Sequence, residues 1–414
     1  MYYLISKNNK TINAEISLPS SKSISNRALI INALSGNALP INNLSDSDDT
    51  RVLNKILHSE DSNEFDIGHA GTSMRFLTAY LTQVAGEWVL TGSSRMKQRP
   101  IGILADALNQ LGGKIQYIEK RGFPPLKIFG SHLKGKTLEM DGTVSSQYIS
   151  SLLMIAPAIE KGLTLKLKGD ITSRSYIEMT LRLMAEFGIE YSWEGDTITI
   201  PEQPYKHSEF TVEADWSAAS YWYEVLALSE SGTIFLNNLN LESLQGDAQI
   251  ADWFKKFGID TIQKEKGLLL KKAEDSNPEK LIQNFIESPD IAQTMACLCV
   301  AKKIPFHFFG LKTLKIKETD RVAALINELA KFGASLSEPK PGELKWDSNV
   351  NLISSSGVPT VETYSDHRMA MSFAPMAAAG FIMQIKDPQV VSKSYPAYWT
   401  DLKKAGFIIS NEKE

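Results

Sequence analysis

Apolar positions along the chain recur with a helical period, end at a glycine, and are followed by short segments that alternate between apolar and polar residues. One such helical pattern is ALNQLGG, followed by KIQYI and LKIFG. The same order appears in RLMAEFG before TITI, and in WFKKFG before IDTIQ and LLLKK. A glycine after the last turn is typical of a helix C-terminus, and the alternating segments predict half-buried strands. The pattern indicates an α/β (α+β) protein.

The glycines that end these predicted helices are regularly spaced. They fall at Gly112, Gly188, Gly258, Gly333 and Gly406, which gives a repeat of about seventy residues. This unit is too long for a solenoid repeat and has the content of a βαβαββ block, with helices covering one face of mixed sheets. About six blocks would fill the chain. A single helix–glycine–strand unit occurs in any α/β protein. The prediction of a repeat architecture therefore depends on the regular spacing of the glycines.

Length and composition predict a soluble protein of ordinary type. The chain has 414 residues, of which 43% are hydrophobic, enough for two or three domains with large cores. No apolar run approaches the roughly 18 residues of a membrane span, and the start MYYLISKNNK lacks the order of a signal peptide. We therefore predict a cytoplasmic protein with no membrane partner. Cys297 and Cys299 stand in an apolar run and predict core packing, and the six scattered histidines predict no metal site.

Much of the positive charge is confined to short strings rich in Ser, Thr and Gly, although the net charge is −4 and the pI about 6.0. These strings are SSKSISNR, GHAGTSMR, RMKQRP, KETDR and DHRM. Small residues let backbone N–H groups and Lys or Arg tips converge on one oxyanion. The strings predict a pocket for a small, multiply charged phosphate or carboxylate. A nucleic-acid partner is not expected, because it would favour a broad basic excess.

Each string by itself has an ordinary structural interpretation. SSKSISNRAL fits a serine N-cap before an amphipathic helix, and KETDRVAAL fits a helix start with exposed charges. GHAGTSMR resembles an anion-binding turn at a helix N-terminus but lacks the Walker pattern GxxxxGK[ST]. DHRM is less ordinary, because it places charge at the tip of an apolar helix. The order of all the strings together is the more specific signal.

In that order the chain contains LPSSKSISNRAL, GHAGTSMR, LTGSSRMKQRPI, DGTVSSQYISSLLMIAP, SRSYIEMTL, VEADWSAASYW, SPDIAQTMA, LKIKETDR, TYSDHRMAM and DPQVVSKSYPAYW. Together these strings resemble the 5-enolpyruvylshikimate-3-phosphate synthase family over essentially the whole chain. The resemblance implies a two-domain inside-out α/β barrel, with three βαβαββ repeats in each domain and the active site in the interdomain cleft. It implies a shikimate 3-phosphate-binding domain at 20–212. Residues 1–19 plus 213–414 would form the second domain, with the acid/base and phosphoenolpyruvate-binding residues.

The family's reaction transfers the enolpyruvyl group of phosphoenolpyruvate to the 5-hydroxyl of shikimate 3-phosphate and releases phosphate through a tetrahedral intermediate. It belongs to the shikimate pathway, which leads to chorismate and the aromatic amino acids, and it uses no metal or organic cofactor. Both substrates are anionic, so cations must offset their repulsion. The residues implied for shikimate 3-phosphate are Ser23, Arg27, Ser145, Ser146, Gln147, Ser173, Tyr176, Asp290, Thr313 and Lys317. Those implied for phosphoenolpyruvate are Lys22, Gly71, Arg95, Gln147, Arg321, Arg368 and Lys393.

Three residues occupy the family's proton-transfer positions. Asp290 is implied as the base at the 5-hydroxyl, and Glu318 as the acid or proton shuttle. Lys22 is the competitor for delivering the proton to the methylene carbon. A carboxylate among cations has a lowered pKa, so the choice between Glu318 and Lys22 stays open.

The chain departs from the usual family pattern at four positions. His69 stands where better-known members have Asn, and Thr313 where many have Asn. Trp216 replaces a small residue, and Phe76 stands where some members have Pro. We infer no glyphosate sensitivity from this sequence.

Three alternative functions are weighed against this one. UDP-N-acetylglucosamine enolpyruvyl transferase shares the fold and chemistry but usually carries a reactive Cys in the loop that corresponds to LTGSSRMKQRP, where this chain has none. RNA 3′-phosphate cyclases share the repeat but lack these strings. A catalytically silent protein that binds a phosphometabolite is disfavoured by the retention of Asp290 and Glu318. We expect a monomer whose partners are its two small-molecule substrates.

Overall fold

The computed structural model describes residues 1–36, 40–59, 62–273, 276–349 and 357–412. The chain folds as two compact units, which we call unit 1 (Met1–Pro19 with Glu213–Glu414) and unit 2 (Ser20–Val212). The chain leaves unit 1 after Pro19 and returns to it at Glu213. Among the described helices none is both long and apolar enough to cross a membrane.

Unit 2 contains two mixed four-stranded sheets, each with one parallel and two antiparallel strand pairs. One four-stranded sheet has the order β4 (Glu64–Asp66), β5 (Glu87–Thr91), β7 (Leu126–Phe129), β6 (Lys114–Tyr117). A second has the order β10 (Ser192–Glu194), β11 (Thr197–Ile200), β9 (Leu163–Lys168), β8 (Thr137–Asp141). A short pair joins β3 (Ile41–Asn42) to β12 (Phe210–Thr211) in parallel. β4 and β8 pair in parallel with β5 and β9, as a βαβ connection requires.

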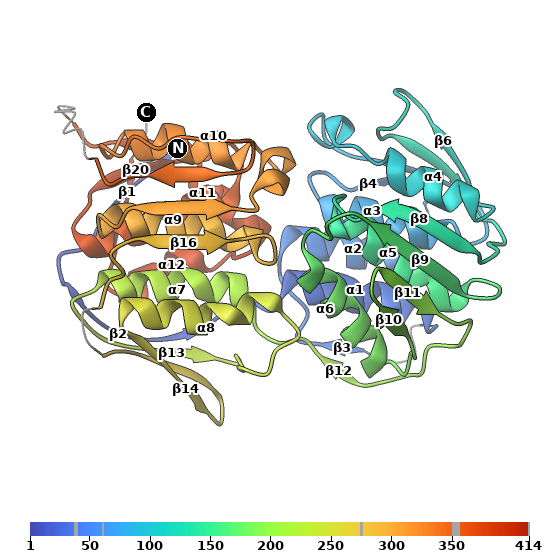
Figure 1. The fold of residues 1–414 in the computed structure, drawn as a ribbon, viewed down its shortest axis with the longest axis horizontal. Helices are drawn as coiled ribbons and strands as arrows, with labels where there is room; N and C mark the ends of the chain where they lie inside the picture. The colour runs from blue at the N-terminus through green and yellow to red at the C-terminus, as the bar shows by residue number, and fades with distance from the viewer. Residues whose placement is uncertain (37–39, 60–61, 274–275, 350–356, 413–414) are drawn as a thin grey trace. The chain divides into compact units, whose positions relative to one another are not determined.

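The helices of unit 2 have buried faces, and α3 and α5 lie in the middle of the unit with strands at its periphery (Figure 1). The α-helices are α1 (Lys22–Leu34), α2 (Asp48–Leu57), α3 (Gly71–Leu81), α4 (Gly102–Gln110), α5 (Ser146–Ile155) and α6 (Arg174–Glu186). The short 3₁₀ helices are η1 (Met96–Gln98) and η2 (Ala156–Ala158). Nine of the eleven residues of α3 are buried, so this helix is enclosed by protein on most sides.

Unit 1 repeats the same plan with longer strands. One sheet has the order β19 (Thr360–Val361), β20 (Met383–Lys386), β1 (Tyr2–Ser6), β21 (Ile408–Glu412). A second has the order β14 (Ile259–Lys264), β15 (Gly267–Lys272), β13 (Ser231–Asn237), β2 (Thr11–Ser17). A third joins β16 (Leu281–Asn284), β17 (Phe306–Phe309) and β18 (Leu344–Trp346). Because β1 pairs with both β20 and β21, the first and last strands of the chain share one sheet.

The helices of unit 1 include α7 (Trp216–Leu228), α8 (Ile250–Trp253), α9 (Ala292–Ala301), α10 (Arg321–Ala330), α11 (His367–Phe373) and α12 (Tyr398–Lys404). The 3₁₀ helices are η3 (Gly246–Gln249), η4 (Phe254–Phe257), η5 (Pro289–Ile291), η6 (Lys312–Ile316), η7 (Ala374–Ala379) and η8 (Pro388–Lys393). All seven residues of α11 are buried, as are nine of ten in α9. These helices form the interior of the unit, which is the inside-out arrangement.

The repeated glycines do what the pattern predicts. All five have φ between 72° and 100°, the left-handed region in which glycine ends a helix without a Cβ clash. Strands follow four of them closely, but the predicted strand in ASLS after Gly333 is reduced to isolated bridge residues at Ala334 and Ser337, the latter paired with Lys345. Cys297 and Cys299 are buried thiols in α9, as predicted.

The two passages between the units are joined within unit 1. The amide of Asp215 donates to the carbonyl of Pro19 at 2.9 Å, and the Asp215 side chain then caps α7 by accepting from the amide of Ala218 at 3.1 Å. The start of α7 is thereby fixed beside the point where the chain first leaves the unit.

Candidate active site

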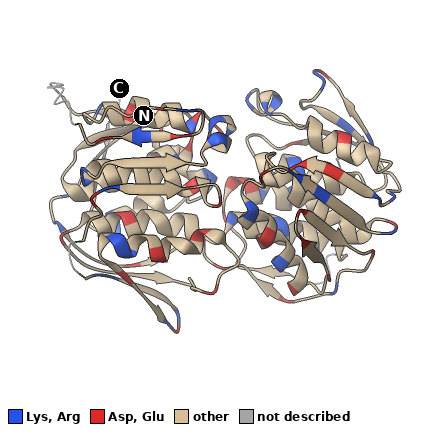
Figure 2. Ribbon diagram, viewed as in Figure 1, with Lys and Arg blue, Asp and Glu red and all other residues tan. Residues whose placement is uncertain are grey.

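Basic and acidic residues are interspersed over the ribbons of both units (Figure 2), in keeping with the small net charge of the chain. The residues predicted to bind substrate nevertheless gather in two groups. One group lies at helix N-termini of unit 2 and the other around Arg321 in unit 1. We call them half-site A and half-site B.

Half-site A is built on the starts of four helices. Ser21 caps α1 by accepting from the amide of Ile24 at 3.4 Å, and Ser145 caps α5 by accepting from the amide of Gln147 at 3.4 Å. Ser173 stands at the N-cap of α6 with φ 55°. The N-cap of α3, Ala70, offers no side-chain cap. Unsatisfied N–H groups and the positive ends of the helix dipoles make such positions attractive to anions.

Arg27 is the buried cation of half-site A. It is 2% exposed, and its Nε donates to Thr180 Oγ1 at 2.7 Å while Nη2 donates to Ser150 Oγ at 3.2 Å. Nη1 donates to the carbonyl of Ser23 at 2.8 Å. These partners are uncharged, and burial lowers the pKa of Arg27 to about 10. A buried guanidinium held by neutral groups is well suited to an anionic ligand.

The contact between Phe76 and Arg27 gives a structural reason for phenylalanine at this position, where some family members have Pro. Its buried ring lies under the guanidinium of Arg27, 5.3 Å from the ring centroid. This cation–π contact stabilises the buried charge of Arg27 in addition to its hydrogen bonds.

A hydrogen bond joins two of the helix starts. Gln147 Nε2 donates to Thr72 Oγ1 at 3.2 Å, which links the SSQ string on α5 to the residue after Gly71 on α3. The guanidinium of Arg99 lies against Gly71, so a larger residue at this position would require the Arg99 side chain to move. Arg99, in the RMKQRP string, was not among the predicted site residues.

The remaining predicted residues of unit 2 lie nearer the surface. Arg95 is exposed at the N-cap of η1. His69 is exposed, with Nδ1 3.0 Å from Ser93 Oγ. Lys22 Nζ lies 3.6 Å from Oδ2 of Asp49, a carboxylate at the start of α2. Tyr176 and Ser146 are half-buried on the first turns of α6 and α5.

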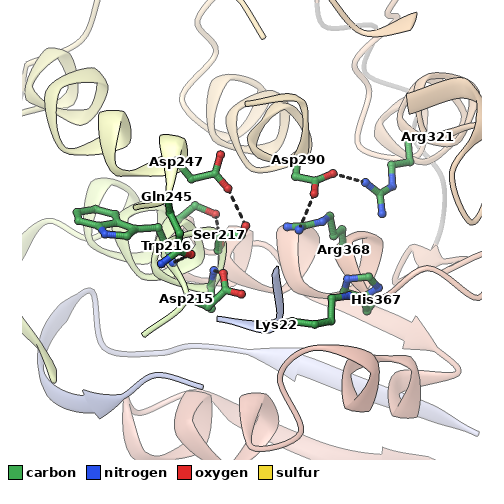
Figure 3. Close-up of polar contacts among 12 residues, drawn as sticks. Lys22, Asp215, Trp216, Ser217, Gln245, Asp247, Asp290, Arg321, His367 and Arg368 are labelled. Carbon is green, nitrogen blue, oxygen red and sulfur yellow. Dashed lines mark hydrogen bonds and ion pairs between the residues drawn. The ribbon is translucent and has the colours of Figure 1, made fainter. Parts of the chain in front are cut away.

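Half-site B is an ion-pair network centred on Asp290 (Figure 3). Arg321 Nη1 donates to its Oδ1 at 2.8 Å, and Arg368 Nη2 donates to its Oδ2 at 2.9 Å. Arg368 also donates from Nη1 to the hydroxyl of Tyr221 at 3.2 Å. Asp290 lies in η5, Arg321 is the first residue of α10 and Arg368 the second of α11, so three separate elements meet at one carboxylate.

Glu318 joins the same network. Arg321 Nη2 donates to Oε2 of Glu318 at 2.9 Å, and Lys393 Nζ donates to Oε1 at 2.5 Å. Arg321 further donates from Nε to Oδ2 of Asp366 at 2.6 Å. Asp366 is fully buried, caps α11 through the amide of Arg368, and was not predicted as a site residue.

The network controls the charge of Asp290. Burial alone would raise its pKa, but Arg368, Lys317 and Arg321 together outweigh burial and hold the pKa well below the ordinary value. For Arg321, burial acts to lower the pKa, and Asp366, Glu318 and Asp290 outweigh it and raise it. Both groups are therefore charged at any working pH.

The other predicted positions in unit 1 divide into site and core. Lys317 is half-buried at the end of η6. Thr313 is also half-buried, and its Oγ1 has no hydrogen-bond partner among the described residues. Trp216 belongs to the core: it is fully buried, stacks on Tyr223 at 6.4 Å and donates to the carbonyl of Asn240. Its large side chain is part of the hydrophobic core of unit 1.

Several contributing residues could not be found from their own positions in the sequence. Thr180 and Ser150 are hydroxyls one turn or more inside their helices, and only the packing of α1 against α5 and α6 brings them to Arg27. Asp366 lies in the DHRM string and Arg99 in the RMKQRP string. Membership of these two charged strings was the sequence signal that could have identified them. Tyr221 lies in VEADWSAASYW, which was quoted only for the resemblance.

The fold and the two half-sites define a class: a two-unit, inside-out α/β protein in which arginines and lysines gather at helix starts and in a largely buried ion-pair network. The sequence model of EPSP synthase (3-phosphoshikimate 1-carboxyvinyltransferase) matches residues 6–59 and 58–402. The chain belongs to this family.

Individual relatives agree with the assignment. A 3-phosphoshikimate 1-carboxyvinyltransferase of Bacteroides fragilis (strain YCH46) is 50% identical over 415 residues, covering 100% of both chains. One of Vibrio atlanticus is 35% identical and covers 95% of this chain and 96% of its own. Among solved structures, EPSP synthase from Acinetobacter baumannii has a TM-score of 0.77 at 19% identity, over 99% of this chain and 100% of its own. The enolpyruvyl transferase NikO from Streptomyces tendae has a TM-score of 0.74 at 15% identity, over 99% of this chain and 98% of its own. The two structures support the two-domain inside-out α/β fold.

Proposed function

We propose that half-sites A and B act on the same pair of anionic substrates, shikimate 3-phosphate and phosphoenolpyruvate. The chain is an enzyme of the shikimate pathway, a transferase that moves the enolpyruvyl group of phosphoenolpyruvate to the 5-hydroxyl of shikimate 3-phosphate. Family membership along the whole chain, with a relative 50% identical over its full length, supports this activity.

The single observation that best supports the site assignment is the network at Asp290. Arg321 and Arg368 each place a guanidinium against this carboxylate, and Lys393 lies against Glu318. Guanidinium forks suit both the carboxylate and the phosphate of phosphoenolpyruvate. We assign phosphoenolpyruvate to Arg321, Arg368 and Lys393, together with Lys22, Gly71, Arg95 and Gln147. An entering anion competes with Asp290 or Glu318 for these cations, which leaves a carboxylate available for proton transfer.

We assign shikimate 3-phosphate to half-site A and to residues of unit 1. The hydroxyls of Ser145, Ser146 and Ser173 and the helix starts beside them suit its phosphate. Arg27 suits its carboxylate, because the buried guanidinium has only neutral partners among the described residues. Ser23, Gln147, Tyr176, Thr313 and Lys317 complete the proposed set.

The proposed chemistry has two stages. In the first, Asp290 takes the proton of the 5-hydroxyl as its oxygen attacks C2 of phosphoenolpyruvate, while the methylene carbon C3 gains a proton from Glu318 or Lys22. In the second, the tetrahedral intermediate loses a proton from C3 and expels phosphate. Asp290 is ionised and therefore able to accept a proton. Because its pKa is strongly lowered, Asp290 is a weak base as long as Arg321 and Arg368 are paired with it. It becomes a stronger base when these arginines bind the substrate anion instead.

A phosphate-release assay tests the function directly. Phosphoenolpyruvate and the chain are combined with shikimate 3-phosphate or, in parallel, with UDP-N-acetylglucosamine. We expect phosphate only with shikimate 3-phosphate. Release only with the nucleotide sugar would assign the other enolpyruvyl transferase activity, and release with neither would leave a binding protein.

We also propose that the enzyme works as a monomer in the cytoplasm. Size-exclusion chromatography with light scattering, with and without both substrates, tests the first point. A mass near twice the 45.9 kDa of the chain would contradict it.

A further inference from the structure

Asp247 is a buried carboxyl group beside half-site B. It lies in η3 and is 5% exposed. Its Oδ2 accepts a hydrogen bond from Ser217 Oγ at 2.7 Å (Figure 3). Its Oδ1 is buried and has no partner of ordinary hydrogen-bond geometry among the described residues. Burying an ionised carboxylate with one oxygen unmatched is costly, so the arrangement suits a group that is protonated for part of its working life.

A hydrogen bond joins η3, which contains Asp247, to the N-cap of η5, which contains Asp290. Gln249 Nε2 donates to Ser288 Oγ at 2.6 Å. Ser288 is the N-cap of η5, in which Asp290 lies. This hydrogen bond therefore links η3 directly to the start of η5. The Ser288 hydroxyl also lies close enough to Asp247 to favour its ionised form.

Ser217 lies between the buried Asp247 carboxyl and solvent. It is the second residue of α7 and is half-buried, whereas Asp247 is buried. A hydroxyl both donates and accepts, so Ser217 can pass its own proton to Asp247 while its oxygen takes another from water. The hydrogen bond seen here already has the donor direction that such a transfer needs.

The two carboxyl groups have opposite surroundings. Burial raises the pKa of Asp247 to about 6, the charge of Asp290 acts in the same direction, and the Ser217 hydrogen bond and Arg368 oppose it. The pKa of Asp290 is held well below the ordinary range by Arg368, Lys317 and Arg321 against burial. When the surroundings of two neighbouring carboxyl groups shift their pKa values in opposite directions, the two groups can take different roles in acid–base catalysis. Asp290 stays an anion, and Asp247 changes its charge near neutral pH.

We propose that Asp247, acting through the Ser217 hydroxyl, is the second proton acceptor behind Asp290 in the transfer reaction. The inference rests on the proposed function. Asp290 takes the proton of the attacking hydroxyl as the new C–O bond forms, and a water molecule carries it to Ser217 Oγ. Ser217 passes its original proton to Oδ2 of Asp247 and keeps the incoming one. The proton leaves to solvent by the reverse path, so each cycle returns both groups to their starting state. Asp247 touches no substrate and is a positioning residue.

The test compares Asp247→Asn and Ser217→Ala with the unchanged enzyme in the phosphate-release assay, from pH 5 to 8. Asparagine keeps the shape and can still accept from Ser217, but it cannot take up a proton. We expect kcat at pH 7 to fall by about 10- to 100-fold, with KM for both substrates within about twofold. The wild-type kcat should decline as pH falls through about 6, where Asp247 becomes protonated. That decline should be absent in Asp247→Asn.

Ser217→Ala gives an independent readout. Loss of the hydroxyl breaks the path to Asp247, so the decline in kcat should be absent in Ser217→Ala, as in Asp247→Asn. The same change removes a hydrogen bond that favours ionised Asp247, so the Asp247 carboxyl itself should titrate at higher pH. A decline caused by the substrate phosphate would stay in place in every variant. The matched control is Ser243→Ala, which removes a serine-to-carboxylate hydrogen bond of the same 2.7 Å length to Glu213. It should leave the pH profile unchanged.

A measurement without substrate separates the inference from the proposed function. Infrared difference spectra between pH 5 and pH 7 should show a protonated carboxyl band that is missing in Asp247→Asn. If the wild type turns over but Asp247→Asn keeps its rate and pH profile, the relay is wrong and the proposed function stands. If Asp247→Asn instead raises both KM values and lowers the melting temperature while the pH decline persists, Asp247 is structural only. If the wild type fails to turn over, the proposed function and the relay fall together.

Discussion

The Arg321 guanidinium and the Asp290 carboxylate form an ion pair of 2.8 Å, in which the arginine is 2% exposed and the aspartate side chain 16%. The same guanidinium reaches Glu318 at 2.9 Å and Asp366 at 2.6 Å. One cation thus organises the residues proposed as base and acid. A substrate anion that binds Arg321 must compete with these carboxylates for its hydrogen bonds. Substrate binding is therefore coupled to the release of Asp290 from Arg321.

Replacing Arg321 with lysine should greatly reduce activity. A lysine keeps the charge but has no planar fork, so it cannot hold three carboxylates and a substrate anion in one geometry. We expect kcat/KM for phosphoenolpyruvate to fall by more than about 10²-fold. Steady-state kinetics with phosphoenolpyruvate varied would measure this. Lys331→Ala, at the other end of α10 where Lys331 pairs with Glu328, is the control and should change kcat/KM little. Near-normal kinetics in Arg321→Lys would remove the fork from the mechanism.

The two proposed proton-transfer carboxylates should be needed for turnover more than for binding. Asp290→Asn and Glu318→Gln keep the side-chain shape and remove the charge. We expect each to lower kcat by about 10²- to 10⁴-fold, the usual contribution of a positioned acid or base. Glu338→Gln is the control, since Glu338 pairs with Lys315 and is not assigned to either substrate. Full turnover in either active-site variant would exclude that residue as a proton carrier.

Arg27→Lys should mainly weaken shikimate 3-phosphate binding. The guanidinium donates four hydrogen bonds, to Thr180, Ser150 and the carbonyls of Ser23 and Tyr176, and lysine cannot reproduce that fork. We expect KM for shikimate 3-phosphate to rise about 10- to 100-fold, the scale of a charged hydrogen bond, while KM for phosphoenolpyruvate changes much less. Arg182→Ala, on the exposed side of α6, should have no such effect. An equal rise in both KM values would contradict the assignment of Arg27 to one substrate.

Asp290 should make stability depend on pH in the acid range. Its pKa is lower in the folded protein than in the unfolded chain, so its ion pairs stabilise the fold above an unfolded value near 4 and are lost as pH falls toward the folded value. Asp290→Asn should cost about 3 kcal/mol at pH 7. The difference from wild type should shrink by about 1 kcal/mol at pH 3. Urea unfolding at the two pH values measures this.

The control for the stability experiment is Asp347→Asn. Asp347 pairs with Lys345 at 2.8 Å, but its side chain is 55% exposed, so solvent screens the pair. Its removal should change stability little at either pH. A gap between Asp290→Asn and wild type that stayed constant from pH 7 to pH 3 would show that the ion pairs of Asp290 do not contribute as described.

Much of the local structure could be predicted because it depends on neighbours in the sequence. The helix-ending glycines have the left-handed φ that their position requires. Ser21 and Ser145 cap the helices that their strings open. Cys297 and Cys299 are buried, as their apolar run indicates. The order of the charged strings also carried the family, because motif order is a property of the sequence alone. The roles given to single residues, and the cleft between domains, stay predictions.

Other features were decided only by tertiary packing. Ion pairs among Asp290, Arg321 and Arg368 join residues up to 78 positions apart, and no local pattern states which carboxylate each arginine meets. Phe76 and Trp216 are both large apolar residues at unusual positions, yet one supports Arg27 and the other fills the core of unit 1. Asp247 showed no signal in the sequence. Its environment comes from Ser217 and Ser288, which the fold brings to it. Local sequence determines which elements form and how they end, whereas burial and the pairing of charges depend on contacts that exist only after those elements have packed.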